Sequence, residues 1–204
     1  MKDIFPNISA APRAERPFPD KKILWGSQDG GQARFPTRAS AYERMYSGDP
    51  VPLKEFGCAV LNAEERIWIV DEYLFMPDSG DPETRIDKIL TWLQKGISAT
   101  DIRLLTRPHR EISDDCLNKF QNRAREINSH APKRTKECRI EIRMHLTRDC
   151  NFIHDRFAVV DDELWHFGAT AGGFHSRVSA ASRGWRAADH GAIDFFEEIW
   201  RAGR

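Results

Sequence analysis

Residues 151–170 read "NFIHDRFAVVDDELWHFGAT", and this stretch holds the most informative pattern in the chain. His154 and Arg156 lie two positions apart at the start of an apolar run, so a β-strand would place both on one face. Asp161 follows the run and opens a short turn. An imidazole and a guanidinium on an apolar strand cost desolvation free energy unless they serve each other or a ligand. These three residues are therefore our candidates for a catalytic site.

Each of the three residues also has a purely structural explanation, since a strand histidine is often a core residue and Asp is favoured in turns. Their combination suits phosphoryl transfer. A neutral imidazole can attack phosphorus and form a phosphohistidine, and a guanidinium can hold phosphate oxygens in a fork. An acid can orient the imidazole and stabilise its charged form. This chemistry needs no metal and no other cofactor.

The chain from about residue 53 onward predicts alternating strands and helices. We expect helices over 52–65, 81–98, 113–130 and 190–204, and strands over 66–75, 101–106, 138–146, 152–160 and 163–169. Helical crossovers imply parallel strand pairing, and the turn at 161–163 implies an antiparallel hairpin. The sum is an α/β sandwich around a mixed sheet.

Residues 1–52 differ in composition from the rest of the chain. Six prolines lie within residues 1–50, and no helical or strand period is sustained there. We expect an irregular, partly extended N-terminal extension with a short helix near 39–46. This extension is predicted to pack onto a single domain formed by residues 53–204.

Composition excludes some classes of protein. The 31 Lys and Arg residues equal the 31 Asp and Glu residues, which argues against indiscriminate coating of nucleic acid. Residues 101–156 nevertheless hold 13 basic and 9 acidic residues, either as a phosphate-binding surface or as an ordinary solvated one. No apolar run or leader of the kind that inserts into membranes is present, and the four cysteines show no close pairing. We expect a cytoplasmic protein with reduced thiols and no membrane partner.

The pattern His154-x-Arg156-x4-Asp161 resembles the HxKx4D signature of the phospholipase D superfamily, with Arg in place of the usual Lys. In that family a glycine follows six residues after the acid, and Gly168 matches it. The order of predicted strands and helices over about residues 54–204 is also similar. The resemblance implies a phospholipase D-like α/β sandwich, with a mixed central sheet flanked by helices.

The sequence departs from that signature after Gly168, where Ala169 and Ala171 replace the usual Ser and Asn. Besides Gly168, the candidates for substrate binding come from two stretches. The segment after the glycine supplies hydroxyl and imidazole groups, although capping and surface roles also explain its serines, and the first predicted strand ends in two alternating polar residues. These candidates are His175, Ser176, Ser182, Asp71 and Tyr73.

Two copies of the motif form one site in this superfamily, where one histidine attacks and the other protonates the leaving group. The sequence holds one copy, so the resemblance implies a homodimer or a partner chain that carries its own motif. Our leading interpretation is a metal-independent nuclease, with DNA favoured over RNA. One alternative is an inactive subunit that binds nucleic acid or scaffolds a larger complex, such as a defence system, and a weaker one is a lipid phosphodiesterase.

Overall fold

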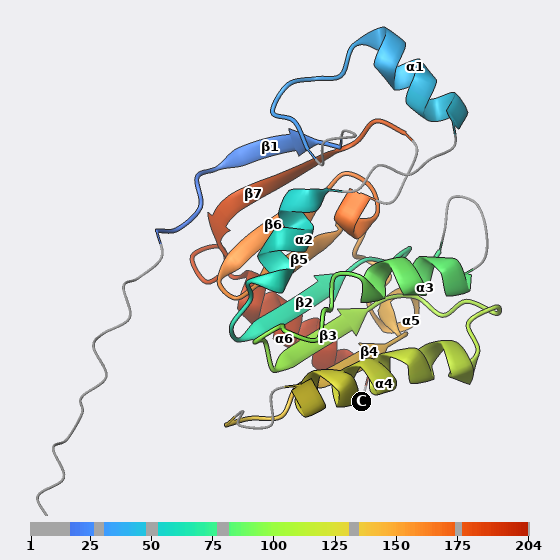
Figure 1. Ribbon diagram of the computed structural model, residues 1–204, viewed down its shortest axis with the longest axis vertical. Coiled ribbons are helices and arrows are strands. Elements are labelled where there is room, and N and C mark those ends of the chain that lie inside the picture. The colour runs from blue at the N-terminus through green and yellow to red at the C-terminus, as the bar shows by residue number, and fades with distance from the viewer. Residues whose placement is uncertain are drawn as a thin grey trace, which may run out of the picture.

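A seven-stranded mixed sheet forms the centre of the structure (Figure 1). The computed structural model describes residues 17–26, 31–47, 53–76, 82–130, 135–173 and 177–203. Its elements in chain order are β1 (Lys22–Trp25), α1 (Arg38–Ser47), α2 (Lys54–Leu61), β2 (Arg66–Val70), α3 (Pro82–Leu90), β3 (Asp101–Leu105), α4 (Asp114–His130), β4 (Arg139–Arg143), α5 (Leu146–Asp149), β5 (Phe157–Val160), β6 (Glu163–Phe167), a 3-10 turn (Ala171–Gly173), β7 (Ala180–Arg186) and α6 (Ala192–Ala202).

The strands lie in the order β1-β7-β6-β5-β2-β3-β4. Strands β2, β3 and β4 pair in parallel, which confirms the helical crossovers predicted from sequence. Strands β5 and β6 form the predicted antiparallel hairpin, and β7 and β1 continue that antiparallel half. The two halves meet at one antiparallel pair, β2 against β5, with Ile69 opposite Ala158. This is the predicted mixed α/β sandwich.

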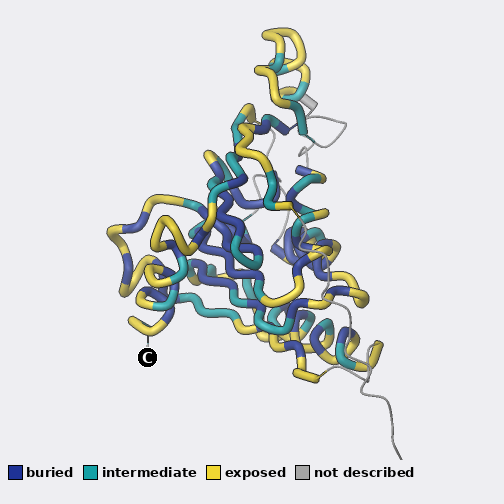
Figure 2. Tube along the Cα trace, turned by 90° about the vertical axis from the view of Figure 1, so that its left-hand side faces the viewer, coloured by how far each residue is buried: buried dark blue, intermediate teal, exposed yellow. Residues whose placement is uncertain are grey.

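Helices cover both faces of the sheet and define two hydrophobic cores. Helices α2, α3 and α4 pack on one face, where Phe56, Ile86 and Phe120 are fully buried. Helices α5 and α6 pack on the other face around Phe196 and Trp200. Figure 1 shows α3 and α4 in front of the sheet with α6 behind it, and Figure 2 shows that the buried residues concentrate in the central strands.

Strand β5 separates the two cores residue by residue, as strand alternation requires. Ala158 and Val160 belong to the core under α2, α3 and α4, whereas Phe157 and Val159 belong to the core under α6. The two residues just before β5 continue this alternation, since Arg156 contacts Asp71 while Asp155 contacts His166. As a result, neighbouring polar residues of the motif reach opposite faces of the sheet.

Several predicted boundaries are wrong. β2 ends at Val70 rather than at residue 75, because the Asp71 carboxylate accepts the Tyr73 N–H at 2.8 Å and turns the chain. β5 begins at Phe157 rather than at residue 152, and α3 ends at Leu90. Strand β7 and helix α5 were not predicted. The β7 sequence AASRGWR is rich in small and polar residues, which give no strand signal.

The predicted N-terminal extension contributes to the sheet. β1 pairs antiparallel with β7 at the sheet edge, although no strand was expected there. Helix α1 falls close to its predicted range, and Figure 1 shows it projecting beyond β1. Residues 1–16 lie outside the described part of the chain. The domain boundary at residue 52 stays a prediction.

Among the described residues, no helix has the length and hydropathy to cross a membrane.

Candidate active site

Asp161 lies at the opposite end of β5 from His154. Its carboxylate accepts backbone N–H groups of three successive residues, Glu64 at 2.9 Å, Glu65 at 2.7 Å and Arg66 at 3.1 Å. The four residues of β5 lie between it and His154, and that strand alone spans roughly 13 Å at about 3.3 Å per residue. The structure therefore corrects the predicted role: Asp161 does not orient the His154 ring but fixes the chain entering β2.

Arg156 and Asp71 form the buried part of the site. Asp71 follows β2 and is fully buried, and the Arg156 Nε lies 3.6 Å from its Oδ1. The same carboxylate accepts the N–H groups of Tyr73 and Ala171, each at 2.8 Å. Burial raises the pKa of the Asp71 carboxyl, while these two N–H groups, Arg156 and Arg85 oppose the rise. Asp71 thus ties Arg156 to the end of β2.

Tyr73 lies beside two guanidinium groups. The Arg156 Cζ is 4.8 Å and the Arg107 Cζ is 4.2 Å from the centre of the Tyr73 ring. Arg107 follows β3, the strand next to β2, so the parallel strand ends bring it to the motif. Sequence reasoning missed Arg107, and the basic excess in residues 101–156 was its only signal. Two cations at this edge create a local positive potential that suits a phosphate.

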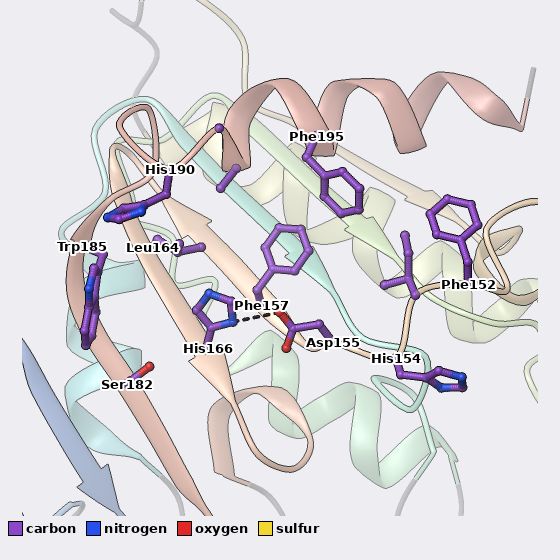
Figure 3. Close-up of a pocket in the computed structure, with 13 residues that line it drawn as sticks. Phe152, His154, Asp155, Phe157, Leu164, His166, Ser182, Trp185, His190 and Phe195 are labelled. Carbon is purple, nitrogen blue, oxygen red and sulfur yellow. Dashed lines mark ion pairs between the residues drawn. The ribbon is translucent and has the colours of Figure 1, made fainter.

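His154 is exposed in the segment just before β5. Within the described residues its ring has no hydrogen bond or ion pair, and Figure 3 shows it pointing away from the Asp155 and His166 pair. Arg156 is less exposed, and its Nε is buried without a hydrogen-bond acceptor in the described part of the chain. That Nε faces the Asp71 Oδ1 at 3.6 Å, which is within ion-pair distance but too long for a hydrogen bond.

Gly168 and the residues after it support the site through the backbone. A Cβ on Gly168 would meet the Ser179 Oγ at 2.9 Å, and the Gly168 N–H donates to the Ala180 carbonyl at 2.8 Å. Close approach of the chain before β7 thus explains this glycine. Ala171, at the position of the family's Asn, contributes its N–H to Asp71 instead of a side chain.

The next residue of the motif, Asp155, reaches the α6 face. Its Oδ2 lies 2.9 Å from the His166 Nδ1, and its Oδ1 accepts the Arg156 N–H at 2.9 Å. Ser182 of β7 stands directly opposite His166 in the sheet. Figure 3 shows Ser182 and His154 at opposite ends of one hollow. The structure therefore separates Ser182 from Arg156, and it adds a carboxylate–imidazole pair that sequence reasoning did not identify.

The remaining predicted site residues, His175 and Ser176, lie outside the described residues. The described ranges contain no cluster of three or more His, Cys, Asp or Glu side chains arranged to hold a metal ion.

Comparisons with known proteins agree with this architecture. The structure superimposes on NucT from Helicobacter pylori with a TM-score of 0.50 and 8% identity, covering 90% of this chain and 98% of that one. The seven-stranded sheet with helices on both faces is the phospholipase D-like fold. No protein-family model matches the sequence, and no curated protein matches it.

Two further solved structures are similar over only part of their length. One is TrmBL2, described as an archaeal chromatin protein with a novel mode of DNA binding (TM-score 0.42, 10% identity, 93% of this chain and 55% of that one). The other is phosphatidylserine synthase of Haemophilus influenzae Rd KW20 (TM-score 0.49, 15% identity, 87% of this chain and 36% of that one). This chain thus spans about half and about a third of these two proteins.

The placement of Asp161 makes a stability prediction. We expect Asp161→Ala to lower the free energy of unfolding by about 2–3 kcal/mol. Three backbone N–H groups lose their acceptor, as happens when a helix cap is removed. In addition, the φ of residue 161 is 53°, a left-handed conformation that alanine adopts less readily than Asp or Asn. Urea denaturation measures the change. Exposed Asp189→Ala is the control, and equal stability of the two variants would contradict the assignment.

The Asp155–His166 pair makes a prediction about pH. The hydrogen bond from His166 is the main cause that lowers the pKa of the Asp155 carboxyl. Stability from this shift is complete above the ordinary carboxyl pKa of about 3.9 and is lost as the pH falls through the lowered value. We expect His166→Phe to raise the pKa of Asp155 towards its ordinary value in a carboxyl NMR titration. The Asp149 pKa, lowered by Arg148 instead, should not move.

Proposed function

We propose that this protein is a phosphodiesterase that cleaves nucleic acid through His154, in a site shared by two copies of the chain. One observation carries the proposal: an exposed imidazole lies two residues before a guanidinium that the buried Asp71 holds beside a second guanidinium, that of Arg107. The resemblance of the motif to that of the phospholipase D superfamily and the phospholipase D-like fold support the same reaction class.

The phosphate would bind between the end of the parallel strands and the start of β5. Arg156 is held in place by Asp71, and Arg107 lies on the same tyrosine ring. A guanidinium keeps its charge at every physiological pH and can contact two phosphate oxygens at once. Arg156 thus binds the phosphate that a lysine binds in that family, but through a planar guanidinium instead of a single ammonium group.

The proposed reaction has two steps. In the first, a neutral His154 nitrogen attacks phosphorus, a P–N bond forms, and the P–O bond to the leaving sugar oxygen breaks as that oxygen takes a proton from a second histidine. In the second, that histidine removes a proton from water. The water oxygen attacks phosphorus, the P–N bond breaks, and His154 is restored. Neither step needs a metal ion.

The second histidine is proposed to be His154 of another copy. His166, the nearest described imidazole paired with an acid, reaches the α6 face of the sheet, while His154 points away from that pair (Figure 3). A two-fold axis near the exposed His154 would place two identical imidazoles on opposite sides of one phosphate. The site would then be incomplete in a single chain.

Nucleic acid is proposed over lipid because the two arginines at the site belong to the basic stretch 101–156. A polyanionic chain benefits from such a surface at several successive phosphates. DNA is the first substrate to test, with RNA beside it.

A second candidate function is nucleic-acid binding without cleavage. It is favoured by the ion pair that occupies Arg156 and by Ala169 and Ala171, which remove the side-chain donors usual after the glycine. Binding through Arg107 and Arg156 would persist in such a subunit.

The test is hydrolysis of labelled single- and double-stranded DNA and RNA by the full chain in EDTA. We expect cleavage, and a loss of at least about a thousandfold in His154→Ala, because both the nucleophile and the acid disappear from the dimer. His130→Ala, an exposed histidine at the end of α4, is the matched control and should keep full activity.

Three results would contradict the enzyme proposal. Cleavage that survives in His154→Ala would exclude the histidine mechanism. Cleavage only after addition of a divalent cation would replace it with metal-assisted hydrolysis. A folded, dimeric protein that binds DNA and cleaves nothing would instead support the binding subunit.

A further inference from the structure

A hollow of about 620 Å³ opens on the α6 face of the sheet, next to His154 (Figure 3). This volume is typical of pockets that take small organic ligands. Helix α6 forms one side of the hollow, and strands β5, β6 and β7 form its floor. Nothing in the proposed phosphate site uses this space, although His154 and Asp155 line its rim.

Aromatic side chains supply much of the wall. Phe152, Phe157 and Phe195 line the hollow beside α6, and Trp185 lines its far end. Phe152 is 68% exposed and Phe195 is 39% exposed, so two large rings face solvent at the entrance. The Phe157 and Phe195 ring centres lie 6.1 Å apart, tilted by 39°. Solvent-exposed rings at a cavity mouth offer stacking surfaces for a flat ligand.

The polar groups of the hollow restrict which ligand fits. The Asp155–His166 pair and Ser182 lie among the aromatic rings. An alkyl chain of a lipid would strip water from this carboxylate–imidazole pair without returning a hydrogen bond, which is costly. A nucleobase carries both a stacking face and an edge of donors and acceptors, so it satisfies the rings and the polar groups together.

We propose that this hollow binds one unstacked nucleobase of the strand whose phosphate is held at His154 and Arg156. The proposal rests on the proposed function, because it assigns the substrate of the same site. His154 belongs to both regions, so the sugar-phosphate chain would pass the imidazole while its neighbouring base turns towards Phe152 and Phe195.

A consequence is preference for single strands. A base inside a duplex is stacked and paired, and it must be unstacked and unpaired before it can enter the hollow. A single-stranded segment or a frayed end avoids that cost. The protein is therefore expected to bind single strands more tightly than duplexes of equal length.

The experiment measures binding rather than cleavage, with the full chain carrying His154→Ala. Fluorescence anisotropy is recorded with a labelled single-stranded oligonucleotide, a matched duplex, and the same strand with abasic sites. We expect Phe152→Ala with Phe195→Ala to weaken single-strand binding at least about fivefold, because a base loses its aromatic stacking partners. Binding of the abasic strand should not change. Phe35→Ala, which removes an exposed phenylalanine near β1, is the control.

The outcomes separate this inference from the enzyme proposal. Equal binding of normal and abasic strands, no effect of the double variant, or no binding of any oligonucleotide would overturn the base pocket, whatever the cleavage assay shows. Binding to phosphatidylglycerol vesicles is measured beside the oligonucleotides. If the double variant loses vesicle binding but keeps oligonucleotide binding, the hollow takes an acyl chain, and the base pocket is overturned. A selective loss on the normal strand supports the pocket even if the protein cleaves nothing.

Discussion

The antiparallel pairing of β2 with β5 is the constraint on which the structure depends, because it is the only described junction between the parallel and antiparallel halves of the sheet. An aspartate fixes the chain at each end of this strand pair. Asp161 holds the chain entering β2 through three N–H groups, and Asp71 at the other end of β2 holds Arg156 and Ala171. The candidate site lies where the second clamp meets the segment before β5.

Because side chains alternate along the chain, the polar groups of residues 154–156 reach two different faces of the sheet. Arg156 reaches Asp71 and Tyr73 at the ends of the parallel strands, while Asp155 reaches His166 under α6. His154 stands exposed at the boundary between the two regions. A phosphate held on one face and a base held on the other would therefore belong to the same nucleotide strand. The proposed reaction and the proposed pocket follow from the same backbone geometry.

The sequence predicted the mixed sheet and its strand directions, because apolar runs, crossover helices and a two-residue turn are local patterns. The sequence also predicted that Asp71 and Tyr73 lie near the motif, because both come at the end of the first predicted strand. The role of Asp161 was wrong because its partners, residues 64–66, are about a hundred positions away in the chain and spacing carries no information about them. Arg107 was missed for a related reason, since its contact with Tyr73 joins segments that follow two different strands. The Asp155–His166 pair joins the two sides of the predicted hairpin, and nothing in the sequence indicated that these two side chains meet. Strand β7 was missed because its small and polar residues have low β-propensity, so that only its pairing with neighbouring strands makes it a strand.

Trapping of the covalent intermediate tests the central claim most directly. Protein mixed with an oligonucleotide in EDTA is quenched in base during turnover, since phosphohistidine survives alkali better than acid, and its peptides are analysed by mass spectrometry. The account predicts a nucleotide or phosphoryl adduct on His154 of one copy, absent from the His154→Ala protein. An adduct on another residue, or rapid cleavage with unmodified His154 throughout, would contradict it.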